Sequence, residues 1–215
     1  MAAGEGRRLR PLTERWPKPV LPVDGRAVVA TVVRDLVAAG CGRITVVTGH
    51  LAEQVEELLG DGDGFGVELR YARQPRPDGS ADAVARGLAA GAAPPLVVAT
   101  ADTVFADGDV ARFAAAEAPA VAVRRAPAAG GAVEVAGGRV VRIGGSGPLF
   151  HASLWSLTPE VVPYLQDLDG PPYELADAYN RAIDDGHEVS AFEVGRTRDL
   201  TDPLDLVQEN FPYLT

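Results

Sequence analysis

The chain has 215 residues, 47% of them apolar and 23% charged, a composition typical of a folded protein large enough for one continuous core. Its net charge of −10 argues against a general nucleic-acid binder, because that affinity depends on neutralising phosphates. No run of about 18 apolar residues predicts a membrane span and no secretory signal opens the chain, so we expect a cytoplasmic protein without a membrane partner.

Apolar periodicity alternates between helix and strand along the first half of the chain. Apolar residues three or four apart predict a helix over residues 26–39, and a β-branched run predicts a buried strand over 43–48. The same patterns predict helices over 51–59, 81–90 and 109–117, and strands over 67–71 and 95–100.

The second half continues with more strands before its helices. Strands are expected over residues 120–124, 132–135, 139–143, 149–157 and 188–194, and helices over 159–168, 174–185 and 203–209. Alternating strands and helices predict an α/β fold with a doubly wound, mostly parallel, Rossmann-like sheet. We expect residues 1–215 to form a single domain whose ligands bind beyond the carboxyl ends of the strands.

The first twenty residues combine glycines with the densest positive charge of the chain. Gly4 and Gly6 allow the backbone to approach phosphate oxygens closely, while Arg8 and Lys18 supply positive charge to a triphosphate. Lys18 is the only lysine in the chain and lies between two prolines. A solvated basic turn is the alternative interpretation of the charge alone.

Asp102 follows directly after the buried strand predicted over residues 95–100. A carboxylate at a strand end is well placed to hold Mg²⁺, which prefers oxygen ligands and bridges phosphates. Such a residue can also cap the next helix, so this alternative stays open.

Four stretches together resemble the sugar-1-phosphate nucleotidyltransferases, the group that includes glucose-1-phosphate thymidylyltransferase and its uridylyl and guanylyl relatives. They are residues 2–19, 71–80, 100–103 and 198–206, so the resemblance extends over nearly the whole chain. It implies that the nucleotide contacts Ala3, Gly4, Gly6, Arg8, Lys18, Gln74, Gly79 and Asp102. The amide of Gln74 offers a donor and an acceptor, which suits the edge of uracil or thymine.

The resemblance also implies a reaction. A nucleoside triphosphate, dTTP or UTP, would transfer its nucleotidyl group to a sugar 1-phosphate and release pyrophosphate. Arg8, Lys18 and Asp102 would be the catalytic residues, and Asp102 and Asp199 the ligands of Mg²⁺. Positioning and electrostatics would supply the rate, since a phosphate monoester is already ionised at neutral pH.

The acceptor side departs from the family pattern. Members commonly carry a Glu-Lys-Pro segment after the strand matched by residues 139–143, whereas residues 143–148 contain neither a lysine nor an acid. Arg142 or Arg198 are the candidate replacements, and His151 and Glu174 are candidate lining residues. A histidine beside a strand is more often structural, and the sequence leaves the sugar, the base and the oligomeric state open.

The start of the chain is the second departure. Family members begin with a buried strand of about five residues before the glycine-rich loop, and here Met1 immediately precedes that loop. We therefore expect the first strand to be missing, with Met1 an internal residue of it and the natural start upstream. Neighbouring strands would then lack ladder partners.

Alternative functions share the same sequence features. A guanylyl, cytidylyl or muramate-1-phosphate uridylyl transferase would use the same frame, and a non-catalytic nucleotide sensor would bind without turnover. The joint presence of Arg8, Lys18, Asp102 and Asp199 favours catalysis.

Overall fold

The computed structural model describes residues 1–125, 132–166 and 168–211. Its α-helices are α1 (Val28–Ala38), α2 (Ala52–Leu59), α3 (Ser80–Ala89), α4 (Asp109–Ala114), α5 (Leu175–Asp184) and α6 (Pro203–Asn210). Its longer strands are β3 (Arg43–Thr48), β4 (Glu68–Arg73), β5 (Leu96–Ala99), β7 (Ala120–Arg125), β8 (Ala132–Ala136), β9 (Arg139–Ile143), β10 (Leu149–Leu157) and β11 (Ser190–Glu193). Two-residue strands add β1 (Pro22–Val23), β2 (Arg26–Ala27), β6 (Thr103–Val104) and β12 (Arg198–Asp199).

Six strands form the central sheet in the order β5-β10-β7-β11-β9-β8, and β3 and β4 form a separate parallel pair. β7 and β11 pair in parallel, and β5 and β7 share one direction because each lies antiparallel to β10 between them. The predicted α/β fold is thus confirmed. Among the described strands, β3–β4 and β7–β11 are parallel pairs. The other pairings of the six-stranded sheet, made by β10 and the β8–β9 hairpin, are antiparallel, which local patterns do not reveal.

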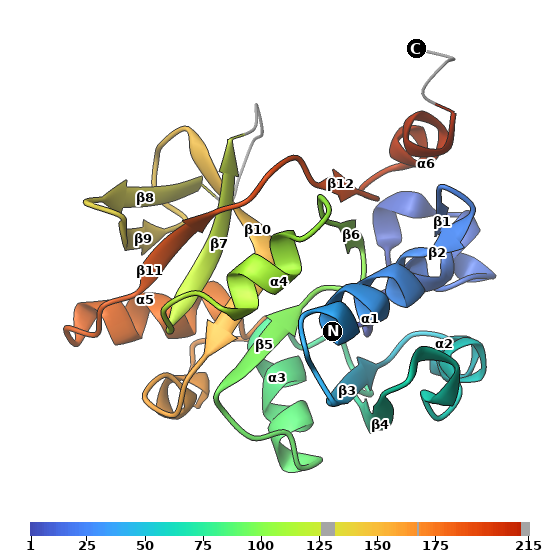
Figure 1. Ribbon diagram of the computed structural model, residues 1–215, viewed down its shortest axis with the longest axis horizontal. Coiled ribbons are helices and arrows are strands. Elements are labelled where there is room, and N and C mark those ends of the chain that lie inside the picture. Colours follow the sequence, from blue (N-terminus) through green and yellow to red (C-terminus); the bar gives the residue numbers. More distant parts are fainter. Residues whose placement is uncertain (126–131, 167, 212–215) are drawn as a thin grey trace.

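The strands are apolar on both faces because helices cover both. In β7, Val121 and Val123 pack in one core cluster, whereas Ala120 and Ala122 pack in another. The first cluster includes residues of α3 and α5, and the second includes residues of α1 and α4. The result is a sheet between two helical layers (Figure 1), which is the doubly wound arrangement.

Residues 1–3 connect β3–β4 to the larger sheet. Ala2 bridges Thr48 in parallel and its N–H donates to the Val47 carbonyl over 2.7 Å. On the other side the Met1 carbonyl accepts from the N–H of Ala101 over 2.8 Å. The segment therefore occupies the expected place of a strand between β3 and β5, at their carboxyl ends.

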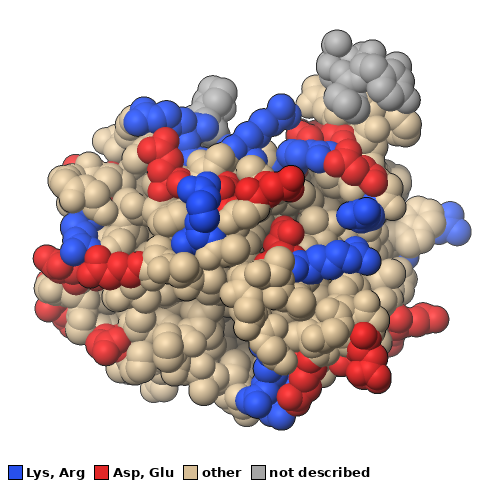
Figure 2. Space-filling model, in the orientation of Figure 1, with Lys and Arg blue, Asp and Glu red and all other residues tan. Residues whose placement is uncertain are grey.

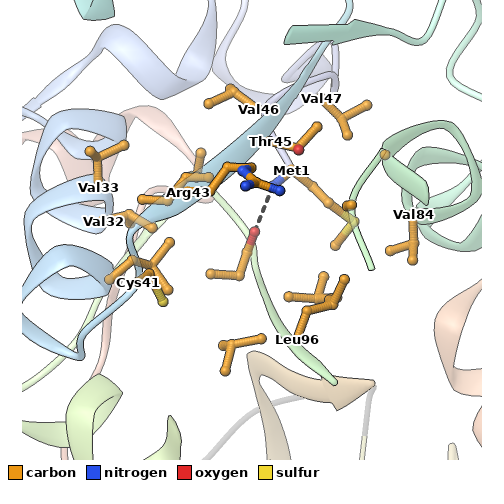
Figure 3. A pocket seen from close by; sticks show the side chains of 18 of the residues that line it. Met1, Val32, Val33, Cys41, Arg43, Thr45, Val46, Val47, Val84 and Leu96 are labelled. Atoms are coloured by element: carbon orange, nitrogen blue, oxygen red, sulfur yellow. Dashed lines mark hydrogen bonds between the residues drawn. The ribbon is translucent and has the colours of Figure 1, made fainter. Parts of the chain in front are cut away.

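An apolar cavity of about 320 Å³ continues from this segment along the gap between β3 and β5. Figure 3 shows Val46 and Val47 of β3, Val84 of α3 and Leu96 of β5 around it. Among the described residues β3 pairs only with β4 and that short segment, so its edge along the cavity lacks a ladder partner. The gap lies where the sequence predicts the missing first strand.

One predicted element is wrong, and two short strand pairs were missed. Residues 159–168 were expected to form an α-helix, but the described part contains only the 3-10 turn Val162–Leu165, and residue 167 lies outside the described residues. Pro163 lies within this turn and has no N–H to continue a helix. The short pairs β1–β2 and β6–β12 were not predicted, because two-residue strands carry no periodicity.

Charge is dispersed over the surface. Figure 2 shows basic and acidic side chains side by side across the face in view, and many of them form ion pairs. No helix in the described part of the chain is both long enough and apolar enough to cross a membrane.

Candidate active site

The fold brings the predicted site residues to one edge of the strands. Gln74 follows the carboxyl end of β4, Asp102 follows that of β5, and residues 1–3 lead into the glycine loop at the same edge. Parallel strands end together, so residues far apart in the sequence gather there.

A polar cavity of about 500 Å³ opens at this edge. Seven of the eight residues predicted to contact the nucleotide line it, and they are Ala3, Gly4, Arg8, Lys18, Gln74, Gly79 and Asp102. The eighth, Gly6, does not line the cavity but shapes the loop. Its φ is +62°, and an added Cβ would lie 2.9 Å from Cγ2 of Thr13.

Three arginines follow the glycine loop, and they have different partners. Arg7 and Arg10 both pair with Glu5, at 2.6 and 3.7 Å. Arg8 lines the cavity, and no carboxylate among the described residues pairs with it. Arg8 is therefore the arginine of this loop that is available to an anionic ligand.

Lys18 and Asp102 form an ion pair in the cavity. The ammonium of Lys18 lies 2.5 Å from Oδ2 of Asp102, and the two side chains are 15% and 35% exposed. Burial opposes ionisation of Asp102, but the nearby Lys18 charge and its hydrogen bond outweigh it and hold the pKa of Asp102 below its ordinary value. The charges of Lys18 and Asp102 thus balance each other within the cavity.

Gln74 is buried and its amide is oriented by two acceptors. Its Nε2 donates to the Gly79 carbonyl over 2.9 Å and to Oδ2 of Asp82 over 2.8 Å. Both N–H bonds are therefore used within the protein, and no donor from the described residues is recorded at Oε1. The expectation that the amide presents a donor and an acceptor needs correction, since only the acceptor remains.

The loop that carries Gly79 is fixed against the start of α5. Gly79 has a φ of +110°, and an added Cβ would lie 2.2 Å from the Tyr173 carbonyl oxygen. The next residue, Ser80, donates its hydroxyl hydrogen to Glu174 and accepts from the N–H of Leu175 over 2.8 Å. Glu174, a predicted sugar-phosphate residue, lines the same cavity, so this contact joins its two sides.

The short strands β6 and β12 bring Asp199 beside Asp102. Asp199 pairs with Thr103 in register, and the Leu200 N–H donates to the Asp102 carbonyl over 3.1 Å. The hydroxyl oxygen of Thr103 lies 2.7 Å from one carboxylate oxygen of Asp199 and 3.4 Å from one of Asp102. Thr103 and Asp199, 96 positions apart, are thus in contact, and the Thr103 hydroxyl lies between the carboxylates of Asp102 and Asp199.

This donor set fits a hard divalent cation. Two carboxylates supply the oxygen ligands that Mg²⁺ prefers, and Mg²⁺ commonly takes its other ligands from water and substrate phosphates. No group of three or more His, Cys, Asp or Glu side chains is assembled for a metal in the described residues. The arrangement therefore fits a metal that arrives with a phosphorylated ligand better than a dedicated protein cage.

The remaining sugar-phosphate candidates lie in different places. Arg198 donates to Glu209 over 2.7 Å and also to Asp24, which links α6 to the β1–β2 turn. Arg142 is exposed on β9. Neither lines the cavity, and the guanidinium of Arg198 is held by Glu209 and Asp24 although Arg198 is next to Asp199 in β12.

His151, on β10, lies near the charges of the site. Burial is the main cause that lowers its pKa, with Arg124 acting in the same direction and Asp199, Glu174 and Asp102 acting against it. The ring is tilted against Trp155 with 5.5 Å between ring centroids, and its Nδ1 is buried without a hydrogen-bond partner among the described residues. A lowered pKa keeps this ring neutral at pH 7.

Arg124 was not among the predicted site residues. Its Nη2 donates to Oδ2 of Asp199 over 2.9 Å, so it neutralises the second carboxylate as Lys18 neutralises the first. Arg124 and Asp199 are 75 positions apart. The local sequence, two arginines at the end of a strand, does not predict this ion pair.

Comparisons with known proteins give the family and the fold of the chain. The pattern of the nucleotidyl transferase family matches residues 1–136. The chain is 43% identical over 84 residues to a low-salt glycan biosynthesis nucleotidyltransferase from Haloferax volcanii, which is 39% of this chain and 24% of that protein. It is 40% identical over 75 residues to an N-acetylmuramate alpha-1-phosphate uridylyltransferase from Neisseria meningitidis, which is 35% of this chain and 32% of that protein.

The matched stretches thus span about a third or less of these curated relatives. Structural similarity covers more of the chain than sequence similarity does. The crystal structure of a putative glucose-1-phosphate thymidylyltransferase from Bacillus anthracis aligns with 97% of this chain and 91% of its own, with a TM-score of 0.84 at 23% identity. Because the family pattern covers more than half of the residues, the chain belongs to the nucleotidyl transferase family.

Proposed function

We propose that the protein transfers a nucleotidyl group from a nucleoside triphosphate to a sugar 1-phosphate and releases pyrophosphate. The observation that carries the proposal is the polar cavity in which the glycine loop, Arg8 and Lys18 face the base-side residue Gln74. Glycine backbone and two cations suit a triphosphate, and a buried amide suits a base. Membership of the nucleotidyl transferase family supports the same reaction class.

The orientation of Gln74 favours uracil or thymine. With both amide hydrogens donated to Gly79 and Asp82, its Oε1 can only accept. Uracil and thymine carry a hydrogen on N3 that this acceptor can bind, whereas N3 of cytosine is a bare acceptor and cytosine would have to present its 4-amino group instead. UTP or dTTP is therefore the nucleotide that we expect.

The transfer itself requires no side-chain nucleophile. An oxygen of the acceptor phosphate attacks the α-phosphorus, the bond from that phosphorus to the bridging oxygen of the β-phosphate breaks, and pyrophosphate leaves with that oxygen. Arg8 and Lys18 stabilise the charge that develops on the leaving group. For this, Lys18 exchanges part of its interaction with Asp102 for one with phosphate oxygens.

Asp102 and Asp199 would hold Mg²⁺, and the Thr103 hydroxyl between them would keep the two carboxylates in place. When bound, the metal offsets negative charge on the phosphates. Without it, Lys18 and Arg124 offset the charges of these carboxylates.

A muramate acceptor is a second candidate. It is favoured by the 40% identity over 75 residues to an N-acetylmuramate alpha-1-phosphate uridylyltransferase. The acceptor sugar has to be identified by experiment, because the curated relatives act on different substrates and this chain matches only part of each.

The test is pyrophosphate release with Mg²⁺ across five nucleoside triphosphates and a set of sugar 1-phosphates that includes N-acetylmuramate 1-phosphate. We expect turnover with UTP or dTTP and one acceptor, and none when EDTA removes the metal. Nucleotide binding without turnover in any combination would contradict the proposal and would favour a sensor.

A further inference from the structure

The acceptor phosphate requires a cation that the sequence does not provide at the expected position. Residues 143–148 contain no lysine, and the two predicted replacements, Arg142 and Arg198, lie away from the cavity or are paired with other carboxylates. A phosphate monoester carries up to two negative charges at pH 7. Beside two carboxylates, this negative charge has to be neutralised by a cation.

Arg124 is the arginine at the carboxyl end of the strands that meets this requirement. It lies on β7, and its Nη2 contacts Asp199 over 2.9 Å. Its Nε is buried and has no acceptor among the described residues. A buried guanidinium nitrogen without an acceptor is costly, and an incoming anion would satisfy it.

His151 provides a second buried nitrogen without a partner. His151 lies near the amino end of β10, and β10 runs antiparallel to β7. His151 and Arg124 therefore lie at the same edge of the sheet. In register, His151 lies opposite Val123 and Phe150 lies opposite Arg124, so the side chains of His151 and Arg124 leave opposite faces of the sheet. A neutral ring with a free nitrogen can donate to a phosphate oxygen or to a hydroxyl.

The neighbouring arginine provides a contrast. Arg125 is 70% exposed and pairs with Glu193 over 3.3 Å, as an ordinary surface residue does. Arg124 is 24% exposed and faces the carboxylates of the site. Two consecutive arginines on one strand thus have different environments, and only one of them lies beside the catalytic candidates.

We infer that Arg124 binds the phosphate group of the acceptor and takes the place of the family's lysine. This inference rests on the proposed function. It also assigns Asp199 two alternating partners: the guanidinium of Arg124 in the free protein, and the metal once the substrates bind. The ligand class is a phosphate monoester, with the sugar extending toward Glu174.

The experiment measures acceptor binding without turnover. α-D-Glucose 1-phosphate and inorganic phosphate are each titrated by calorimetry into the protein with Mg²⁺ present and without nucleotide, so that Asp199 can bind the metal and no turnover occurs. The variants are Arg124→Met, Arg124→Lys and the matched control Arg125→Met, and thermal unfolding of each establishes that it is folded. UTP affinity is measured in parallel.

We expect Arg124→Met to weaken binding of both probes about 10- to 100-fold, as loss of a charge-assisted hydrogen bond does, with UTP affinity unchanged. Arg124→Lys restores part of the affinity, and Arg125→Met binds as the unmodified protein does. Unchanged binding in a folded Arg124→Met variant would overturn the inference, as would no binding of either probe to the unmodified protein. Binding that depends on Arg124 without turnover for any nucleotide would contradict the proposed function and leave this inference standing.

Discussion

Two cavities of this protein meet at Met1 and Ala101 and differ in the charged and hydrogen-bonding groups that line them. The polar cavity is bounded by an ion pair, a glycine loop and a buried amide, and its donors and acceptors are partly unfilled. The apolar cavity between β3 and β5 is lined mainly by valine, alanine and leucine side chains.

The two cavities differ in the interactions that are unfilled in each. Lys18 balances the charge of Asp102 in the polar cavity, and Arg124 balances that of Asp199 beside it, so a ligand that brings phosphate and metal can exchange these partners. In the apolar cavity, the edge of β3 has no ladder partner among the described residues, and the lining side chains lack packing partners. Changes in the first should therefore alter chemistry, and changes in the second should alter stability.

Asp102→Asn should have the largest effect. It removes the negative charge that pairs with Lys18 and that would hold the metal, so we expect pyrophosphate release to fall about 10³-fold, the scale of losing one electrostatic group from a preorganised site. Thermal unfolding should change little. The control is Asp107→Asn, an exposed loop residue that should retain full activity. Equal activity of both variants would remove Asp102 from the mechanism.

Gly79→Ala should destabilise the wall of the polar cavity. An added Cβ would overlap the Tyr173 backbone at a φ of +110°, so we expect a loss of about 2–4 kcal/mol in the free energy of unfolding. Gly108→Ala is the matched control, since its φ is +79° but no atom lies within 4 Å of the added Cβ. It should lose only about 1 kcal/mol in urea unfolding. Similar losses would mean that contact with Tyr173 does not fix this loop.

Gln74→Met should alter base recognition more than catalysis. It keeps the volume but removes the Oε1 acceptor, so we expect KM for UTP to rise about tenfold, with a smaller change in kcat. The preference for UTP over CTP should narrow in steady-state kinetics. An unchanged ratio would show that another residue reads the base.

Val84→Ile should have the smallest effect and the opposite sign. The added methyl group enters the apolar cavity, so we expect a gain of about 0.5–1 kcal/mol in the free energy of unfolding, with unchanged activity. Val55→Ile is the control, because Val55 is fully buried and does not line the cavity, and overpacking should cost about 1–3 kcal/mol. Destabilisation by both would indicate that the space near Val84 is already filled.

Much of the fold follows from local patterns. The predicted strands over residues 43–48, 139–143 and 149–157 have the bounds of β3, β9 and β10, because β-branched and apolar runs between turn residues have few other solutions. The antiparallel direction of β10 could not be predicted, since it depends on pairing with β5 and β7, whose residues lie far away in the sequence.

Site residues that lie close together in the sequence could be predicted from a motif. Site residues that only the fold brings together were harder to predict. The glycine loop and Lys18 lie within 20 residues, and the structure brings them to one cavity with Asp102. Arg124 was missed because its partner Asp199 reaches it only through the β6–β12 pairing. The orientation of the Gln74 amide likewise depends on Asp82, a contact that the sequence does not specify.

The most direct test is a crystal structure of the protein with UTP and Mg²⁺. We predict the triphosphate against residues 3–8 and Lys18, the uracil N3 within hydrogen-bond distance of Oε1 of Gln74, and the metal between Asp102 and Asp199. Electron density for the nucleotide outside the polar cavity, or Lys18 and Arg124 still paired with both carboxylates beside a bound metal, would contradict the account.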